Sequence, residues 1–369
     1  MAAFSNGAAK AIKAELQSLS STPHPSLFDM LSSLPDEIGA AQKGDVFEVP
    51  SIADFTIYSD GSTDQTANDP SLSALTLTID QEPFLPINIT RRRQKQLLGG
   101  GNWAQQLAIE ANSQIRNYLD RDVADYLFEL AYDSSATYYT NVGGLTLSNT
   151  MLLEAAAALA AQRGATDKIA YVLDAYSEAQ LHSLAGFLYN PGQIQMGVAG
   201  FRQVGMLHGR PVILTNENPG SAARGAYTVA TTAAVTTGSG TIHTYTVAAG
   251  HNLVPGMYVT VSGHDADENI STAAAITSVG ATSVVVTTSA TADGTSSDAS
   301  GTITLRSALN FVVDFGHMWK GMSDEIMVRL VDQQSNTGSR LHISPLYGMI
   351  GRAGRVRAFC SPRASLTQS

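Results

Sequence analysis

The sequence predicts an α+β fold that carries a small all-β segment within it. Three observations support this prediction: one very long amphipathic helix, strand-like segments on both sides of that helix, and a threonine-rich region late in the chain. The chain has 369 residues, of which 44% are hydrophobic and 15% charged, so it can bury the cores of about two domains. No run approaches the ~20 apolar residues that a bilayer span requires, and we therefore expect no membrane association.

The N-terminal part of the chain combines an arm with a β-excursion. Residues 1–42 mix a short amphipathic stretch with several prolines, which indicates an extended N-terminal arm. Residues 43–98 alternate apolar and polar side chains around a polar segment at 59–71, a pattern typical of a long two-stranded excursion, or extended β loop, with a polar tip. Because two strands alone bury too little to be stable in water, we expect this excursion to lie on another surface.

A long helix is predicted over residues 102–132, within a region that spans 99–168. Its apolar residues recur every three or four positions with charged residues between them, and Asn102 is placed to cap its first turn. A rise of ~1.5 Å per residue makes this helix roughly 45 Å long. An alanine-rich helix follows Thr150 and ends at Gly164.

The next region, 169–219, has the alternation of an α+β domain. An apolar strand over Ile169–Leu173 precedes a short helix whose start carries a Ser177-x-x-Gln180 capping box. A buried strand over Pro211–Leu214 follows, with a loop that closes at Pro219. Residues 306–345 return to the composition and strand pattern of this α+β region after an intervening segment. Residues 346–369 supply a closing strand and a tail.

The interruption, residues 220–305, differs in composition from the rest of the chain. It has no Lys, Phe or Trp and is dominated by Thr, Ala, Ser, Val and Gly. Six short strand candidates alternate with turn residues, which predicts a small all-β sandwich or barrel inserted into the host domain. Arg224 opposes five acidic residues in this segment, so the charge is nearly of one sign.

Charge and motifs exclude several classes of function. A formal net charge of −10 argues against a dedicated nucleic-acid binder, because phosphate contacts require a basic field. The sequence lacks the nucleotide-binding, hydrolase and zinc-peptidase motifs, and its one cysteine cannot form an internal disulfide. We expect no catalytic residues, no cofactor and no metal. The acidic cluster His264–Glu268 is the one group that could bind a divalent cation through oxygen ligands, and we interpret it instead as an acidic surface loop.

Two local groups of basic residues stand out against this acidic background. The first comprises Arg91, Arg92, Arg93 and Lys95. It is either a solvated junction between strand and helix or an inter-subunit contact in which guanidinium groups pair with a neighbour's carboxylates. The second, near the C-terminus, comprises Arg352, Arg355, Arg357 and Arg363. It either contacts nucleic acid non-specifically or is an exposed, partly ordered chain end.

The order of these parts resembles the major capsid proteins of tailed bacteriophages, which have the Hong Kong 97 fold. The extended loop of that fold is similar to DVFEVPSIADFTIYSDG and LTLTIDQEPFLPINITRRR. Its spine helix is similar to NWAQQLAIEANSQIRNYLDRDVADYLFELA. IAYVLDAYSEAQLHSLAG and MLHGRPVILTNENP are similar to the axial-domain pattern, and GRAGRVRAFCSPRAS to the closing strand of the peripheral domain. The insertion contains the segment HNLVPGMYVTVSG, which resembles a sequence motif of Ig-like phage surface modules.

The resemblance implies a structural role without enzymatic activity. Subunits would assemble into hexamers and pentamers of an icosahedral head, made in the host cytoplasm, that encloses double-stranded DNA. A separate scaffolding protein and a portal are implied partners, and a decoration protein is a further candidate. Within the family layout, residues 99–168 and 346–369 would form the peripheral domain and residues 169–219 and 306–345 the axial domain.

Three other functions stay open at this level. The shell of an encapsulin-like bacterial nanocompartment has the same fold but stores a cargo enzyme. A glycan-binding role for the threonine-rich segment would need an aromatic platform, and that segment offers only Tyr227, Tyr245 and Tyr258. An enzyme of unrecognised type would need a convergent acid, base or nucleophile, and none is apparent.

Overall fold

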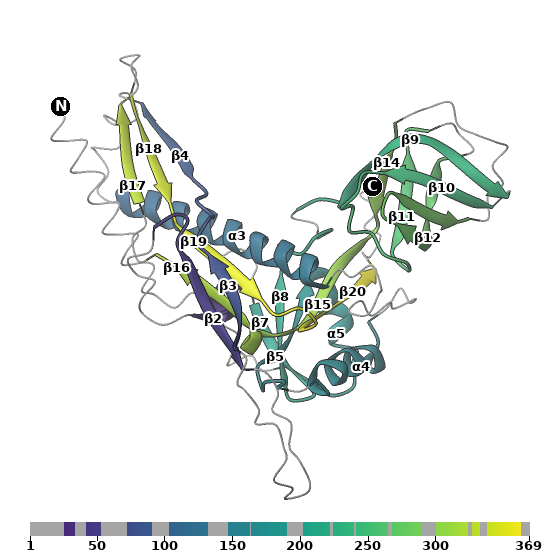
Figure 1. Ribbon diagram of the computed structural model, residues 1–369, viewed down its shortest axis with the longest axis horizontal. Coiled ribbons are helices and arrows are strands. Elements are labelled where there is room, and N and C mark those ends of the chain that lie inside the picture. The colour runs from purple at the N-terminus through teal and green to yellow at the C-terminus, as the bar shows by residue number, and fades with distance from the viewer. Residues whose placement is uncertain are drawn as a thin grey trace, which may run out of the picture. The chain divides into compact units, whose positions relative to one another are not determined.

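The computed structural model describes residues 26–33, 42–52, 72–90, 103–131, 147–162, 164–189, 202–221, 224–239, 241–264, 268–288, 300–323, 327–332 and 338–362. The chain divides into two compact units. Unit 1 comprises Met1–Thr22, Leu31–Ile115 and Met318–Arg352, and unit 2 comprises Pro23–Met30, Arg116–His317 and Ala353–Ser369. The units are taken in turn below, with the elements labelled as in Figure 1.

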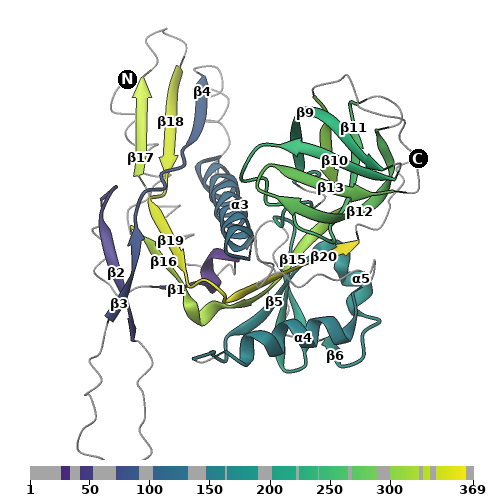
Figure 2. The same ribbon diagram turned by 45° about the vertical axis from the view of Figure 1, so that its right-hand side comes forward.

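Unit 1 contains three small sheets, which account for the strands predicted on both sides of the long helix. A two-stranded antiparallel ribbon pairs β2 (Val46–Ile52) with β3 (Leu72–Thr78). A three-stranded sheet has the order β1-β16-β19, from Ser32–Ser33, Met318–Met322 and Tyr347–Gly351. The third sheet has the order β17-β18-β4, from Met327–Asp332, Gly338–Ser344 and Leu85–Thr90 (Figure 2).

The third of these sheets differs from the sequence expectation for residues 43–98. The alternating segment around Leu85–Thr90 was expected to belong to the two-stranded excursion. In the structure it pairs with β18, about 250 residues further along the chain, with Leu341 opposite Ile87. Periodicity identified the strand correctly, but it carries no information about which distant strand completes the ladder.

Helix α3 spans Trp103–Ala131, a length of 29 residues. At ~1.5 Å per residue it extends about 44 Å, as the apolar periodicity predicted. The buried side chains of its second half fall at helical spacing and include Leu119, Val123, Leu127 and Ala131. In the part of the chain that the structure describes, no helix combines the length and the apolar character that crossing a membrane would require.

Unit 2 is organised around a six-stranded sheet of order β20-β15-β5-β8-β7-β6. Its central strands β5 (Ile169–Asp174) and β8 (Arg210–Thr215) are parallel, and the other neighbours are antiparallel. The remaining strands are β6 (Phe187–Tyr189), β7 (Arg202–Leu207), β15 (Ser307–Asp314) and β20 (Val356–Pro362). Strand β5 covers the apolar run Ile169–Leu173 that the sequence predicted as a strand, and every residue of it is buried.

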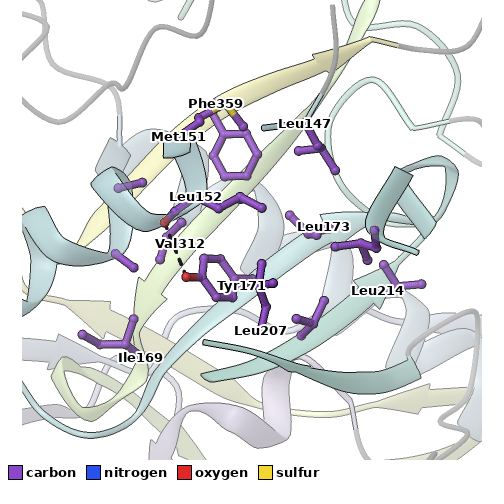
Figure 3. Packing of buried hydrophobic residues seen from close by; sticks show 14 of the residues in the cluster. Leu147, Met151, Leu152, Ile169, Tyr171, Leu173, Leu207, Leu214, Val312 and Phe359 are labelled. Atoms are coloured by element: carbon purple, nitrogen blue, oxygen red, sulfur yellow. Dashed lines mark hydrogen bonds between the residues drawn. The ribbon is translucent and has the colours of Figure 1, made fainter. Parts of the chain in front are cut away.

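Helix α4 (Asn149–Ala160) packs against this sheet and completes its core (Figure 3). The Ser148 hydroxyl caps α4 by accepting a hydrogen bond from the Met151 N–H at 3.3 Å. Leu152, Tyr171 and Phe359 meet in the resulting core, and the Tyr171 hydroxyl donates to the Leu152 carbonyl oxygen at 3.4 Å. Burial raises the pKa of the Tyr171 hydroxyl above its ordinary value.

The capping box predicted at Ser177 is wrong. Helix α5 (Glu178–Leu181) does begin there, but the Ser177 side chain makes no capping hydrogen bond to the helix. Its backbone is in the helical region rather than the extended one that an N-cap adopts. The Gln180 side chain instead accepts a hydrogen bond from the Leu147 N–H at 3.0 Å, so it ties α5 to the segment that leads into α4.

Six strands within residues 220–305 form a closed antiparallel barrel of order β10-β13-β12-β11-β14-β9 (Figure 1). The strands are Thr228–Ser239, Ile242–Val247, Tyr258–Ser262, Ile270–Gly280, Ser283–Thr287 and Thr302–Leu305, in chain order from β9 to β14. Their inward side chains include Tyr245, Val259, Val284 and Ile303, all of which are buried. Closure into one barrel distinguishes this segment from a two-sheet Ig-like sandwich.

The last segments of the chain are distributed differently from the predicted domain layout. Residues 346–369 were expected to close the peripheral domain. Strand β19 instead pairs with β16 in unit 1, and β20 pairs with β15 at the edge of the six-stranded sheet in unit 2. The pairing of β20 buries Ala358 and Phe359, which explains why this strand joins the larger core.

Candidate assembly surfaces

The β2–β3 ribbon has one covered face and one open face. Phe47, Val49, Leu75 and Leu77 contribute to a small core with Leu346 from the segment before β19. On the opposite face Val46 lies across from Thr78 and Glu48 across from Thr76, and all four are exposed. Val46 is 56% exposed, which is high for a β-branched apolar residue in a strand.

The ribbon is attached to the neighbouring sheet at one end. Gln81 and Tyr347 exchange two backbone hydrogen bonds, of 3.1 and 3.0 Å. Close by, Gly348 lies against Thr78 so tightly that a Cβ atom at position 348 would overlap the Thr78 carbonyl oxygen. The base of the ribbon is therefore fixed, while its open face keeps apolar surface in solvent.

The β17-β18-β4 sheet also exposes an aromatic side chain. Phe84, immediately before β4, is 65% exposed and stacks on His342 of β18 with ring centroids 5.8 Å apart. On the same sheet the Arg340 side chain donates through Nε to the side-chain oxygen Oδ1 of Asn88 at 3.0 Å. Strands β17 and β4 lie at the two edges of this sheet, so their outer backbone groups face away from the ladder.

The predicted basic residues have different outcomes. Arg91, Arg92, Arg93 and Lys95 lie outside the described residues, as does Arg363. Arg352 is exposed. Arg355 and Arg357 are buried within their own subunit, and Arg355 is only 4% exposed. The prediction that these two contact nucleic acid is therefore corrected, and it stays open for Arg352 alone among the described residues.

The burial of Arg355 follows from a carboxylate that the sequence analysis missed. Asp314, at the end of β15, is fully buried, and its Oδ2 lies 3.7 Å from the Arg355 guanidinium. Asp314 also accepts hydrogen bonds from the N–H and the hydroxyl of Thr166. The only sequence signal was an Asp directly after the apolar strand LNFVV, and the arginine that pairs with it is 41 positions further on.

The acidic cluster predicted as a surface loop is partly inside the barrel. Asp265, Ala266 and Asp267 lie outside the described residues, whereas His264 and Glu268 are buried. The His264 ring contacts the Thr231 hydroxyl at 3.1 Å, and the Glu268 carbonyl oxygen accepts from the Tyr245 hydroxyl at 2.6 Å. Burial and the nearby Glu268 carboxylate raise the pKa of Tyr245. Among the described residues, no group of three His, Cys, Asp or Glu side chains could hold a metal ion.

No protein-family model and no curated protein matches this sequence. Solved structures of shells do match. A chain of the mature capsid of bacteriophage PhiM1 is 13% identical, with 92% of this chain and 88% of that chain covered and a TM-score of 0.46. A chain of the capsid of an empty GTA particle is 10% identical, with 92% and 91% covered and a TM-score of 0.48.

An encapsulin is also among the similar structures. A chain of the holo-SrpI encapsulin complex from Synechococcus elongatus PCC 7942 is 9% identical, with 92% of this chain and 91% of that chain covered and a TM-score of 0.40. The mixed helix and sheet content described above is that of an α+β protein. Over about nine-tenths of its length, this chain is similar in fold to chains of bacteriophage capsids.

Proposed function

We propose that this chain is the major capsid protein of a bacteriophage, a structural subunit that self-assembles into hexamers and pentamers of an icosahedral head around double-stranded DNA. The observation that carries the proposal is the open face of the β2–β3 ribbon. An apolar side chain such as Val46 gains free energy when it is covered, and the ribbon's own core occupies only its other face. A neighbouring copy of the same chain is the partner that a symmetric shell supplies.

The distribution of exposed groups in unit 1 supports many small contacts rather than one large interface. Val46 lies on the ribbon and Phe84 precedes a strand of a separate sheet, so the apolar groups are divided between two elements. Contacts of this kind are individually weak, but a closed shell repeats them in every subunit and gains from their multivalency. A separate scaffolding protein, a portal and a decoration protein are further partners that this role calls for.

Two elements of the unassembled subunit, helix α3 and the β2–β3 ribbon, have regular backbone structure that can support such contacts. Helix α3 is continuous over 29 residues, and the β2–β3 ribbon is fixed at its base by the Gln81–Tyr347 bridge. Rigid elements lose little conformational entropy on association, which leaves more of the contact free energy for assembly. The proposed role is therefore structural, with no catalytic step.

Electron microscopy of the purified chain tests this proposal, both alone and co-expressed with a candidate scaffolding protein. Closed particles of uniform diameter with five-fold and six-fold clusters support a shell subunit. A monodisperse monomer or dimer under both conditions contradicts it.

The contents of the particles then separate the phage head from the nanocompartment. Particles recovered from the native source are treated with nuclease, opened and analysed for DNA and for a second protein. Protected double-stranded DNA supports the capsid protein. A packaged enzyme without DNA assigns the chain to an encapsulin-like shell instead.

A further inference from the structure

A short segment near the N-terminus is held on helix α3 by a buried carboxylate. Residues Ser26–Met30 contain the 3₁₀ helix η1 (Phe28–Met30). Leu27 and Phe28 are buried, and the Phe28 N–H donates to Oδ1 of Asp120 at 3.0 Å. The Leu27 N–H also hydrogen-bonds to this carboxyl group. We call residues 26–30 the clip.

A second pair of contacts fixes the exposed side of the clip. The Ser26 hydroxyl donates to Oδ2 of Asp29 at 2.9 Å, and the Asp29 N–H donates back to the Ser26 hydroxyl at 3.2 Å. Arg116, one helical turn before Asp120, lies 3.0 Å from the same Asp29 oxygen. These contacts fix the position of the clip on α3, where the clip covers the Asp120 side chain.

The environment of Asp120 opposes its negative charge. The residue is only 2% exposed, and two other carboxylates, Asp29 of the clip and Glu217 of the loop after β8, face it. Arg116, one helical turn before Asp120, forms an ion pair with Asp29. Burial raises the pKa of the Asp120 carboxyl to about 7, against the lowering effect of the two backbone N–H groups.

Glu217, on the loop after β8, also opposes a negative charge on Asp120. Burial raises the pKa of Glu217 above its ordinary value, while Arg224 and Arg121 favour the ionised Glu217. Glu217 therefore adds negative charge on one side of Asp120 wherever it is ionised. Asp29, which pairs with Arg116, adds to it on the clip side.

We infer that the clip binds α3 when the Asp120 carboxyl carries a proton and opens as that carboxyl ionises. A neutral carboxyl keeps a carbonyl oxygen that can accept the Phe28 N–H, and it removes the cost of holding a charge in the buried site. Ionisation restores that cost, and opening relieves it by exposing Asp120 to water.

The direction of the pH dependence follows from the two protonation states. The carboxyl has a pKa of about 7 in the closed clip and an ordinary value of 3.8 once exposed, so the closed state holds the proton more tightly. Stabilisation of the clip is complete below about pH 4, declines as pH rises to about 7, and is level above that. Between pH 5.5 and pH 8 the opening equilibrium therefore rises on the order of 30-fold.

Amide hydrogen exchange on the unassembled full-length chain tests this inference. The opening constant at Leu27 and Phe28 is obtained at pH 5.5 and pH 8 after correction for the intrinsic exchange rate. The buried amide of Val172 in β5 reports global unfolding for comparison. A rise of roughly 30-fold at the clip, without a matching rise at Val172, is expected.

Two variants locate the effect. Asp120→Asn keeps the shape and an acceptor oxygen without a titrating group, so its clip should open equally at both pH values. Glu129→Gln, at an exposed position of the same helix, should retain the wild-type pH dependence. The inference is overturned if the wild-type clip opens equally at pH 5.5 and pH 8, or if Asp120→Asn keeps the 30-fold rise. The wild-type measurement decides the matter even if Asp120→Asn does not fold.

Discussion

The guanidinium group of Arg224 makes a two-pronged contact with the carboxylate of Asp125 on helix α3, with N–O distances of 2.8 and 2.9 Å. Arg224 also donates to the Glu217 carbonyl oxygen at 2.9 Å. A few residues on, Tyr227 packs edge to face on Phe128 of α3 and donates to the His251 carbonyl oxygen in the barrel. The segment that leads into the barrel is thus fastened both to the helix and to the barrel.

Replacing Arg224 tests this fastening. Arg224→Met keeps most of the aliphatic side chain but removes the planar guanidinium group. We expect it to lower the free energy of unfolding by at most about 1 kcal/mol, because Asp125 is partly exposed to solvent. Arg224→Lys should recover little of the loss, since an ammonium group cannot make the two-pronged contact. Chemical denaturation followed by circular dichroism measures both. Full recovery by lysine would show that charge alone matters here.

The core of unit 2 offers a matched pair of neighbouring leucines. Leu152 is 0% exposed in the cluster with Tyr171 and Phe359, whereas Leu153 on the same helix is 38% exposed. We expect Leu152→Ala to cost about 3 kcal/mol through lost burial and a residual cavity, and Leu153→Ala to cost less than about 1 kcal/mol. Thermal and chemical unfolding give the two values. Equal costs would contradict the assigned orientation of α4.

The buried pair of Asp314 and Arg355 predicts a non-additive double mutant. Asp314→Asn removes the charge that faces Arg355 and should destabilise the chain by about 3 kcal/mol. Adding Arg355→Met removes the cation as well, so the double variant should be more stable than the sum of the two single changes predicts. A double-mutant cycle measured by denaturation checks this. Strict additivity would mean that the two groups do not interact.

The barrel should be removable, because its two ends meet. Thr228 at the start of β9 pairs with Thr304 near the end of β14. We expect a chain in which a short Gly-Ser linker replaces residues 228–305 to remain soluble and to keep the six-stranded sheet, with the Leu152 and Tyr171 core intact. Unfolding followed by tyrosine fluorescence and circular dichroism is the measurement. An insoluble product, beside a soluble full-length chain, would assign the barrel an essential folding role.

Local patterns in the sequence predicted elements well. The apolar period of α3 predicted a helix over 102–132, and the structure has Trp103–Ala131. The alternation of YVTVSG and SVVVTT predicted β11 and β13, because inward and outward side chains of a barrel strand differ in polarity. These features depend on neighbouring residues alone, which is why one sequence suffices to see them.

Long-range pairing was beyond the sequence. Nothing in Leu85–Thr90 indicates β18 as its partner, and nothing around Arg355 indicates Asp314. In the sequence, Asp120 is likewise one of several charged residues on an amphipathic helix. Only the structure shows that the clip covers its carboxyl group. A basic run was interpreted as surface charge because arginine is usually exposed, and that rule fails where a distant carboxylate pairs with the guanidinium inside the fold.

Sedimentation velocity over a range of concentrations tests the central claim, self-assembly through the open face of the ribbon, most directly. The account predicts large closed particles for the wild type. It predicts unassembled subunits for Val46→Asp, which places a charge on that face, with thermal unfolding of the subunit unchanged. A single boundary of monomer or dimer for the wild type at every concentration, or particles formed equally well by Val46→Asp, would contradict it.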